Sequence, residues 1–302
     1  MRTQAVYREE PWPRRCIVVR LTVRNDFMDF SSDVITLSID GPVATLWLDR
    51  PEARNALGSA FWRDLPLAAS ALAGDPSVRV VVVAAKGPHF TVGLDLKEFG
   101  GGLLGGGGGA STATANARAY RAVRTMQDSV TSIAQLEVPV IAAVHGYCIG
   151  GGVDMITACD VRLASNDAVF SVRETKVAIV ADLGTLQRLP KIVSAGHVAE
   201  LAYTGKDIDA ARAESIGLVN SRHGTSAEEV LAAAYDLARE IAANSPVAVR
   251  GTKAVLAAND GRTVEEGLDF VARWNTMYLQ SNDLREAMTA FLERRSPEFT
   301  GD

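Results

Sequence analysis

Three consecutive glycines are the first candidate for chemistry in this sequence. Gly150, Gly151 and Gly152 follow an apolar run and open a helical pattern that carries Asp154. Glycine has no Cβ, so a ligand oxygen can approach its backbone, and N–H groups at the start of a helix favour negative charge. One of them could donate to a carbonyl oxygen that becomes an oxyanion. A tight turn that packs a helix against a strand would produce the same pattern.

A second segment offers another donor of the same kind. Residues 89–99, HFTVGLDLKEF, also follow an apolar run, and the step from Gly93 to Leu94 could present a backbone N–H group from the other side. Two such donors form an oxyanion hole, which stabilises negative charge on a carbonyl oxygen. The two glycine segments together predict a site for a carbonyl group that becomes negatively charged.

The elements that position these segments begin with a hairpin and a helix. Residues 34–40 and 42–50 alternate or run apolar on either side of Gly41, which predicts two strands joined by a turn. Residues 59–74 show helical spacing, with Ser59 as the expected N-terminal cap.

Two later apolar runs predict strands that are covered on both faces. They span residues 78–85 and 138–144, are rich in β-branched residues, and have a helical stretch over about 115–136 between them. Strands that alternate with helices predict crossover units of an α/β fold. The glycine-rich residues 101–112 predict a mobile surface loop, with a flexible lip over a ligand as the alternative. No Lys-Ser/Thr pair follows them, which argues against a phosphate-binding loop.

The composition favours a globular protein of the cytoplasm with a small-molecule substrate. The chain has 302 residues, 47% of them hydrophobic, so it can bury a large core. A formal net charge of −5 argues against nucleic acid or an anionic membrane as the main partner. The ending EFTGD is no peroxisomal SKL-type signal. An odd number of cysteines without a CxxC pair indicates neither a disulfide framework nor a metal site; these are Cys16, Cys148 and Cys159.

Three regions are expected along the chain. Residues 1–30 are rich in arginine but also contain acids, which favours an N-terminal extension over a targeting signal. Residues 31–225 hold the predicted core, and residues 226–302 are almost continuously helical in pattern. Three aromatic residues in the last region are expected to be core or subunit contacts: Trp274, Tyr278 and Phe291.

Three motifs, taken in order, resemble the crotonase, or enoyl-CoA hydratase/isomerase, superfamily. They are LDRPEARNAL at 48–57, FTVGLDLKEF at 90–99 and AAVHGYCIGGGVDMITACD at 142–160. The resemblance runs from about Val34 to the C-terminus. It implies a spiral of repeated ββα units with a C-terminal helical region that forms trimers, as a homotrimer or a dimer of trimers. It also implies an acyl-CoA thioester substrate, with coenzyme A as part of that substrate and no separate cofactor.

The resemblance also implies roles for individual residues. By position in the motifs, the oxyanion donors are the N–H groups of Leu94 and Gly151. Residues near the first and second motifs are implied to bind the coenzyme A moiety and the substrate: Ala53, Arg54, Asn55, Val92, Gly93, Asp95 and Leu96.

Three acids resemble the pattern of one subgroup, the Δ3,5-Δ2,4-dienoyl-CoA isomerases. They are Asp154, Glu174 and Asp182, the last in a place where hydratases commonly have glycine. The resemblance implies that Glu174 and Asp182 carry a proton from the α-carbon to a distant carbon, while Asp154 orients or tunes Glu174. Burial and mutual repulsion would separate the pKa values of the pair. Which of the two attacks C2 stays open.

Each acid also has a purely structural interpretation. Asp154 could complement a helix dipole. Glu174 could pair with Arg173 or Lys176 as a surface acid, and Asp182 could cap the helix that follows it.

Two other functions fit the same residues. The first is an enoyl-CoA hydratase, in which Asp154 and Glu174 activate water. The second is a catalytically silent acyl-CoA-binding scaffold. His145 is expected to pack or to support the site, since no acid and nucleophile pattern makes it part of a triad.

Overall fold

The computed structural model describes residues 23–24, 27–28, 30, 32–103 and 111–302. Most of the expected N-terminal extension, residues 1–30, therefore lies outside the described residues. Within it, β1 (Val23–Arg24) and β2 (Phe27–Met28) pair as an antiparallel two-stranded ribbon.

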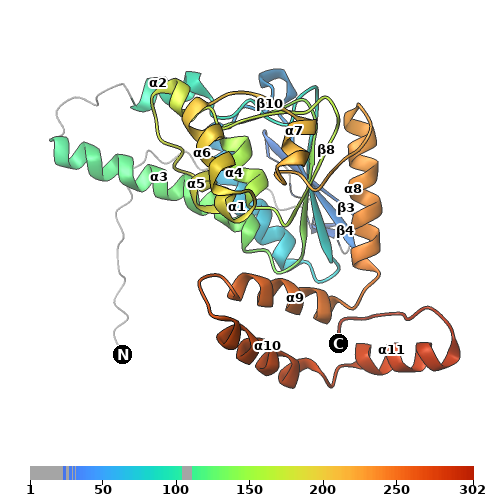
Figure 1. Ribbon diagram of the computed structural model, residues 1–302. Helices are drawn as coiled ribbons and strands as arrows, with labels where there is room; N and C mark the ends of the chain where they lie inside the picture. Colours follow the sequence, from blue (N-terminus) through green and yellow to red (C-terminus); the bar gives the residue numbers. More distant parts are fainter. Residues whose placement is uncertain (1–22, 25–26, 29, 31, 104–110) are drawn as a thin grey trace, which may run out of the picture.

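A six-stranded sheet forms the centre of the molecule (Figure 1). Its first two strands are the expected antiparallel hairpin, and each later strand pairs in parallel with its neighbour. Parallel neighbours require crossover connections, and helices supply most of them, as the alternating sequence pattern predicts. In spatial order the strands are β11 (Ser221–Arg222), β8 (Val161–Ala164), β6 (Val140–Val144), β5 (Val80–Ala85), β4 (Val43–Leu48) and β3 (Ile35–Asp40).

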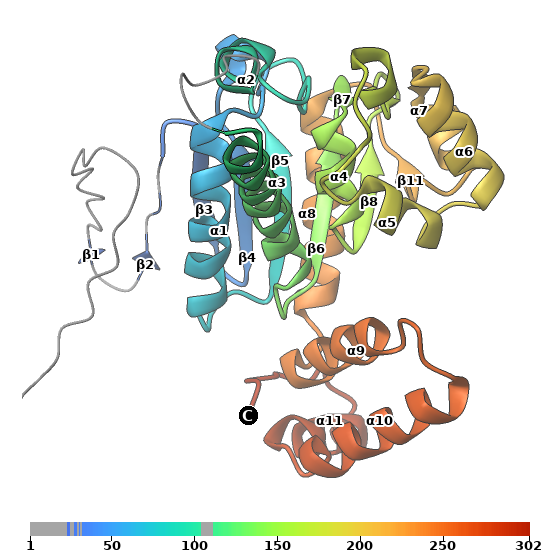
Figure 2. The same ribbon diagram turned by 90° about the vertical axis from the view of Figure 1, so that its left-hand side faces the viewer.

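Helices cover both faces of this sheet, which is why β5 and β6 are buried along their whole length. Helices α1 (Ser59–Gly74) and α3 (Thr112–Ala134) pack against each other on one side (Figure 2). Helix α8 (Ala227–Ala242) covers the other side, where its alanine-rich stripe meets the side chains of Val80, Val82 and Ile141. Residues of small volume let the helix lie close to the strands.

A second, three-stranded sheet places the glycine segments next to each other. It consists of β10 (Ile208–Asp209), β9 (Val169–Ser171) and β7 (Tyr147–Ile149). Isolated bridges from Thr91 to Cys148 and from Leu57 to Leu94 continue it. After most strands of the large sheet, the chain thus forms a short extended segment that pairs within the second sheet or continues it. The predicted spiral of ββα units is confirmed.

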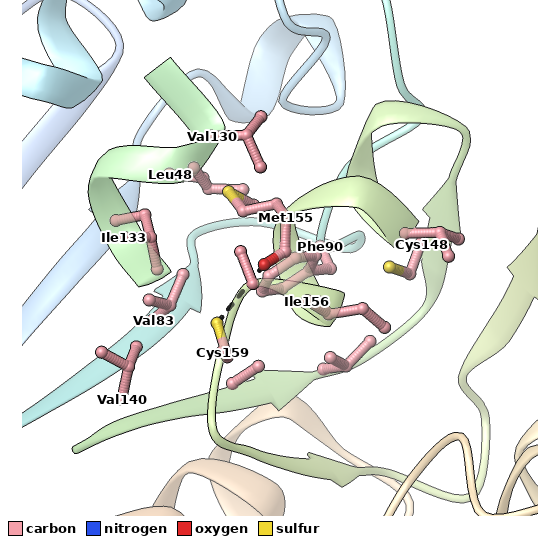
Figure 3. Close-up of a cluster of buried hydrophobic side chains, with 14 of the residues drawn as sticks. Leu48, Val83, Phe90, Val130, Ile133, Val140, Cys148, Met155, Ile156 and Cys159 are labelled. Atoms are coloured by element: carbon pink, nitrogen blue, oxygen red, sulfur yellow. Dashed lines mark hydrogen bonds between the residues drawn. The ribbon is translucent and has the colours of Figure 1, made fainter. Parts of the chain in front are cut away.

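Helix α4 (Gly151–Thr157), which follows the glycines, is embedded in the core. Figure 3 shows Met155 and Ile156 among apolar side chains from α3 and the large sheet. Cys148 and Cys159 lie in the same region, and both are buried free thiols. Burial raises the pKa of the Cys148 thiol well above its usual value and that of Cys159 to about 12, so both stay protonated and unreactive.

The C-terminal helices α9 to α11 form a group below the spiral (Figure 2). Several hydrogen bonds connect this group to the core. Among them, Lys253 Nζ donates to Asp160 Oδ2 over 2.6 Å, and Arg79 Nη2 donates to Phe299 O over 2.7 Å. The remaining helices are α2 (Leu96–Leu103), α5 (Thr185–Arg188), α6 (Ala195–Thr204), α7 (Ala210–Ser215), α9 (Pro246–Ala258), α10 (Val264–Tyr278) and α11 (Asn282–Glu293).

Two local predictions were wrong. Residues 101–103 of the expected glycine loop belong to α2, while 104–110 lie outside the described residues. Ser59 is the first helical residue of α1 and not its cap; Gly58 is the N-cap, and the distant Glu98 accepts from the Ser59 N–H over 2.8 Å. Phe291 is 80% exposed, which excludes it from the core and leaves the predicted subunit contact.

Among the residues that the structure describes, no helix is both long enough and apolar enough to cross a membrane.

Candidate active site

The two glycine segments, residues 91–94 and 147–152, contact each other through their backbones. The Thr91 N–H donates to Tyr147 O over 2.8 Å and the Ile149 N–H donates to Thr91 O over 3.1 Å. Gly93 has a φ of +85°, and a Cβ built on it would lie 2.7 Å from Ile149 O and 3.7 Å from the Gly151 nitrogen. A contact under 3.0 Å is one that a real Cβ does not make, so only glycine allows this approach.

The predicted oxyanion donors remain available for a ligand. Neighbouring N–H groups are used by the fold: Gly93 donates to Thr91 Oγ1 and Gly150 donates to Ser171 O over 2.9 Å. By contrast, neither the Leu94 N–H nor the Gly151 N–H donates to any of the residues described here. Two unused donors on adjacent segments can bind one carbonyl oxygen.

The loop at residues 50–56 lies against the second glycine segment. The Val92 N–H donates to Arg54 O over 3.2 Å, which brings two of the predicted substrate-binding stretches together. The Asn55 side chain is buried and donates to Lys86 O and His89 O, both over 2.9 Å, so it holds the loop in shape. Ala53 is half-buried, whereas Arg54 and Leu96 are exposed. Contact of these residues with coenzyme A stays a prediction.

Arg50, for which no role was predicted, joins the same two loops. Its Nη1 donates to Asp95 Oδ2 over 2.8 Å, directly after Leu94. Burial favours a higher pKa for Asp95, but the hydrogen bonds from Arg50 and from the first N–H groups of α2 outweigh it and lower the pKa. Asp95 therefore positions the loop that carries the Leu94 donor. Arg50 lies within the first motif, at the end of a strand, which is the signal that could have identified it.

His145 has the packing role that was expected. It is 5% exposed, and its Nε2 lies 2.8 Å from Gly87 O.

Asp154 is almost completely buried in the first turn of α4. Its Oδ1 accepts from the Thr185 N–H over 2.6 Å, which fastens the start of α5 to α4. Burial raises the pKa of Asp154 to about 6, although the hydrogen bonding from Thr185 opposes the shift. Asp154 therefore does more than complement the dipole of α4, because it also holds the start of α5 in place.

Glu174 lies beside the glycine turn. Its Oε1 is 3.2 Å from the position that a Cβ on Gly150 would occupy, and its Oε2 is buried without a hydrogen-bond partner in the described part of the chain. Arg173 pairs with Asp207 instead, so the ion-pair interpretation of Glu174 is not supported. Burial, followed by repulsion from Asp154 and Asp182, raises the pKa of Glu174 to about 7.

Asp182 is the most exposed of the three acids. The N-cap of α5 is Gly184, with no hydrogen bond from a side chain, so the capping interpretation of Asp182 is wrong. Burial still raises the pKa of Asp182, and its charge contributes to the raised pKa of both Asp154 and Glu174. The structure therefore brings the three predicted acids into one electrostatic cluster next to the unused N–H groups.

Strongly perturbed carboxyl groups beside free backbone donors are typical of an active site. The arrangement can bind a carbonyl oxygen, stabilise negative charge on it, and move a proton between two carboxyl groups. Within the described ranges, no group of three His, Cys, Asp or Glu side chains is arranged to hold a metal ion.

Comparison with known proteins identifies the family. The sequence profile described as enoyl-CoA hydratase/isomerase matches residues 38–302, which is most of the chain. The chain belongs to the enoyl-CoA hydratase/isomerase family. A family member from Arabidopsis thaliana, a peroxisomal Δ(3,5)-Δ(2,4)-dienoyl-CoA isomerase, is 42% identical over 267 residues, which cover 88% of this chain and 96% of that protein. A mitochondrial Δ(3,5)-Δ(2,4)-dienoyl-CoA isomerase from Dictyostelium discoideum is 44% identical, over 85% of this chain and 87% of that one.

Solved structures of family members share the fold. An enoyl-CoA hydratase from Bacillus anthracis superimposes with a TM-score of 0.80 at 29% identity, covering 89% of this chain and all of that one. An enoyl-CoA hydratase from Mycobacterium tuberculosis gives a TM-score of 0.77 at 31% identity, over 90% of this chain and 100% of that chain. Relatives that are named as isomerases and relatives that are named as hydratases therefore share the spiral. The fold does not decide between these reactions, so the carboxyl groups of the site must distinguish them.

Proposed function

We propose that this protein is a Δ3,5-Δ2,4-dienoyl-CoA isomerase, which shifts two double bonds of an acyl-CoA thioester. One observation carries the proposal: Glu174 has a buried, unpartnered carboxylate oxygen beside the Gly150 turn, and a second acid, Asp182, is close enough to raise its pKa. The relatives from Arabidopsis thaliana and Dictyostelium discoideum, which are 42% and 44% identical, are named for the same reaction, and this supports the proposal.

The thioester carbonyl oxygen accepts hydrogen bonds from the N–H groups of Leu94 and Gly151. Loss of a proton from C2 turns the carbonyl into a dienolate, whose negative charge lies partly on this oxygen. Each well-placed donor lowers the barrier by about 3 kcal/mol. Glycine at position 93 keeps the two donors close enough to share one oxygen.

The resting proton of the carboxyl pair resides on Glu174. Its pKa is raised to about 7, whereas Asp182 has a lower ordinary pKa and is more exposed. Ionised Asp182 therefore removes a proton from C2, and protonated Glu174 donates one to C6. The C2–H bond breaks, the C3=C4 and C5=C6 bonds become C2=C3 and C4=C5, and a C6–H bond forms. Exposed Asp182 then releases its proton to water, and Glu174 takes one up.

The pH dependence of turnover tests this assignment. As the pH rises through about 7, Glu174 loses the proton that it must donate, so kcat should fall. At acidic pH, protonation of Asp182 removes the base, and kcat should fall again. The measurement is a kcat profile with a 3,5-dienoyl-CoA. A rate that rises from pH 7 to a plateau above it would instead make Glu174 the base.

Two substrates separate this function from the alternatives. With 3,5-octadienoyl-CoA, the protein should produce the near-ultraviolet absorption of a conjugated 2,4-dienoyl thioester. Rapid hydration of crotonyl-CoA without any diene shift would identify a hydratase. Thioester binding without turnover of either compound, unchanged by Glu174→Gln and Asp182→Asn, would identify a silent binding protein.

The other expectations belong to the same proposal. We infer an acyl-CoA substrate, no cofactor apart from its coenzyme A, and no nucleic-acid or membrane partner. A homotrimer or dimer of trimers would cover apolar side chains of the C-terminal helices such as Val264, Phe291 and Leu292, each at least 80% exposed. A cytoplasmic location stays a prediction, and the relatives from Arabidopsis thaliana and Dictyostelium discoideum are named as peroxisomal and mitochondrial.

A further inference from the structure

Three side chains form hydrogen bonds with the backbone of residues 182–185, the segment that carries Asp182. Gln127 Nε2 donates to Asp182 O over 2.6 Å. Arg188 Nη1 donates to Leu183 O over 3.3 Å, and the Thr185 N–H donates to Asp154 Oδ1 over 2.6 Å. Each consecutive contact fixes a different peptide group, so the segment has little freedom to rotate.

Helix α3 supplies one of these anchors and supports a second. Gln127 and Thr131 are four residues apart, which places them on the same face of the helix. Gln127 binds Asp182 directly, and Thr131 Oγ1 accepts from Arg188 Nη2 over 2.9 Å. Arg188 thus connects α3 to the Leu183 carbonyl. The Gln127 amide is oriented in turn, because its Oε1 accepts from Arg124 Nη1 over 2.8 Å.

Asp182 depends on this backbone support. Its side chain is exposed and makes no hydrogen bond to another residue in the described ranges. Asp154 and Glu174, by comparison, are held by their buried surroundings. A proton-transferring group must be held within a fraction of an ångström of its productive position, and a displacement of about 1 Å can reduce the rate by about a hundredfold.

We propose that Gln127 is a positioning residue for proton transfer by Asp182. It contacts no reacting atom in this assignment and acts through the Asp182 carbonyl. The inference rests on the proposed function, because it concerns one of the two carboxyl groups that move protons. It also gives α3 a part in the site that neither the three motifs nor the glycine segments indicate.

The test compares three variants of the full-length protein. Gln127→Met keeps the length of the side chain but removes the donor, whereas Gln127→Lys retains an N–H donor. Gln135→Met is the matched control, since Gln135 is exposed at the end of the same helix. We expect Gln127→Met to reduce kcat for a 3,5-dienoyl-CoA by about tenfold to a hundredfold with KM changed less than about twofold. Gln127→Lys should recover most of the rate, and Gln135→Met should match the wild type.

Deuterium uptake at C2 in heavy water gives a readout that a purely structural role would not change selectively. In Gln127→Met it should fall in proportion to kcat, because Asp182 removes that proton, while the decline of kcat above pH 7 that Glu174 causes stays in place. Wild-type kcat in Gln127→Met, together with inactive Asp182→Asn, would overturn this inference and leave the proposed function standing. Full activity in Asp182→Asn would overturn the proposed function itself.

Discussion

Glu174→Gln is expected to reduce isomerisation of a 3,5-dienoyl-CoA by a factor of about 10³ or more. The amide resembles the protonated acid in shape but has no proton to donate to C6, and general acid catalysis contributes factors of about 10² to 10⁴. Deuterium uptake at C2 should continue, because Asp182 still removes that proton. The measurements are single-substrate kinetics and mass spectrometry of thioester recovered from heavy water. Complete loss of uptake, with the rate lost as well, would assign C2 to Glu174.

The stability of the same variant separates chemistry from unfolding. Glu174 has its pKa raised from 4.5 to about 7, so the folded state holds the proton more tightly than the unfolded state. The stability contributed by this proton is complete below pH 4.5 and is lost as the pH rises through about 7. Glutamine carries no charge. The stability of Glu174→Gln relative to the wild type should therefore increase by roughly 3 kcal/mol between about pH 4 and pH 8. Denaturant titrations at one protein concentration would show it.

Gly93→Ala is expected to reduce kcat by about 10² or more. The added Cβ would lie 2.7 Å from Ile149 O, and the φ of +85° disfavours any side chain. Because Ile149 precedes the Gly150–Gly151 step, relief of this contact moves the Leu94 and Gly151 donors apart. Removal of one oxyanion donor typically lowers kcat by about 10² to 10³.

Gly196→Ala is the matched control for this substitution. Gly196 lies in α6, and a Cβ there would meet nothing within 4 Å. The alanine should leave kcat unchanged. Bound 2,4-dienoyl-CoA offers a second readout, since a carbonyl polarised by two donors shifts the ultraviolet absorption of the thioester to longer wavelength. If a folded Gly93→Ala protein keeps the wild-type kcat and the wild-type ultraviolet shift of the bound thioester, the assignment of the Leu94 and Gly151 N–H groups as oxyanion donors is contradicted.

Much of the fold could be predicted because its signals are local. The short, β-branched run VVVVAA of β5 is typical of a strand buried on both sides, and its burial is complete. The glycines at 93 and 150–152 could also be recognised in the sequence as points of close approach. A Cβ on Gly93 would meet the backbone oxygen of Ile149, and a Cβ on any of the three consecutive glycines would meet a side chain from another segment. The acids were recognised from their order along the chain, and the structure shows that they share one electrostatic environment.

Contacts between distant side chains could not be predicted. The bond from Gln127 to Asp182 spans 55 positions and that from Arg50 to Asp95 spans 45. Neither pair has a local pattern, because such bonds depend on how complete elements pack. Ser59 shows the same limit at a helix start: a serine suits the cap, but the N-cap is Gly58, and Glu98 from α2 accepts from the Ser59 N–H.

The position of α8 has a consequence for the newly made chain on the ribosome. The strands of the large sheet from β3 to β6 can assemble in the order of their synthesis, because each later turn of the spiral docks on the one before it. The face that holds Val80, Val82 and Ile141 has no cover until α8 has emerged. Such uncovered apolar strands promote aggregation and attract chaperones. Nascent chains that stop before Ala227 must therefore be the form most dependent on chaperone protection.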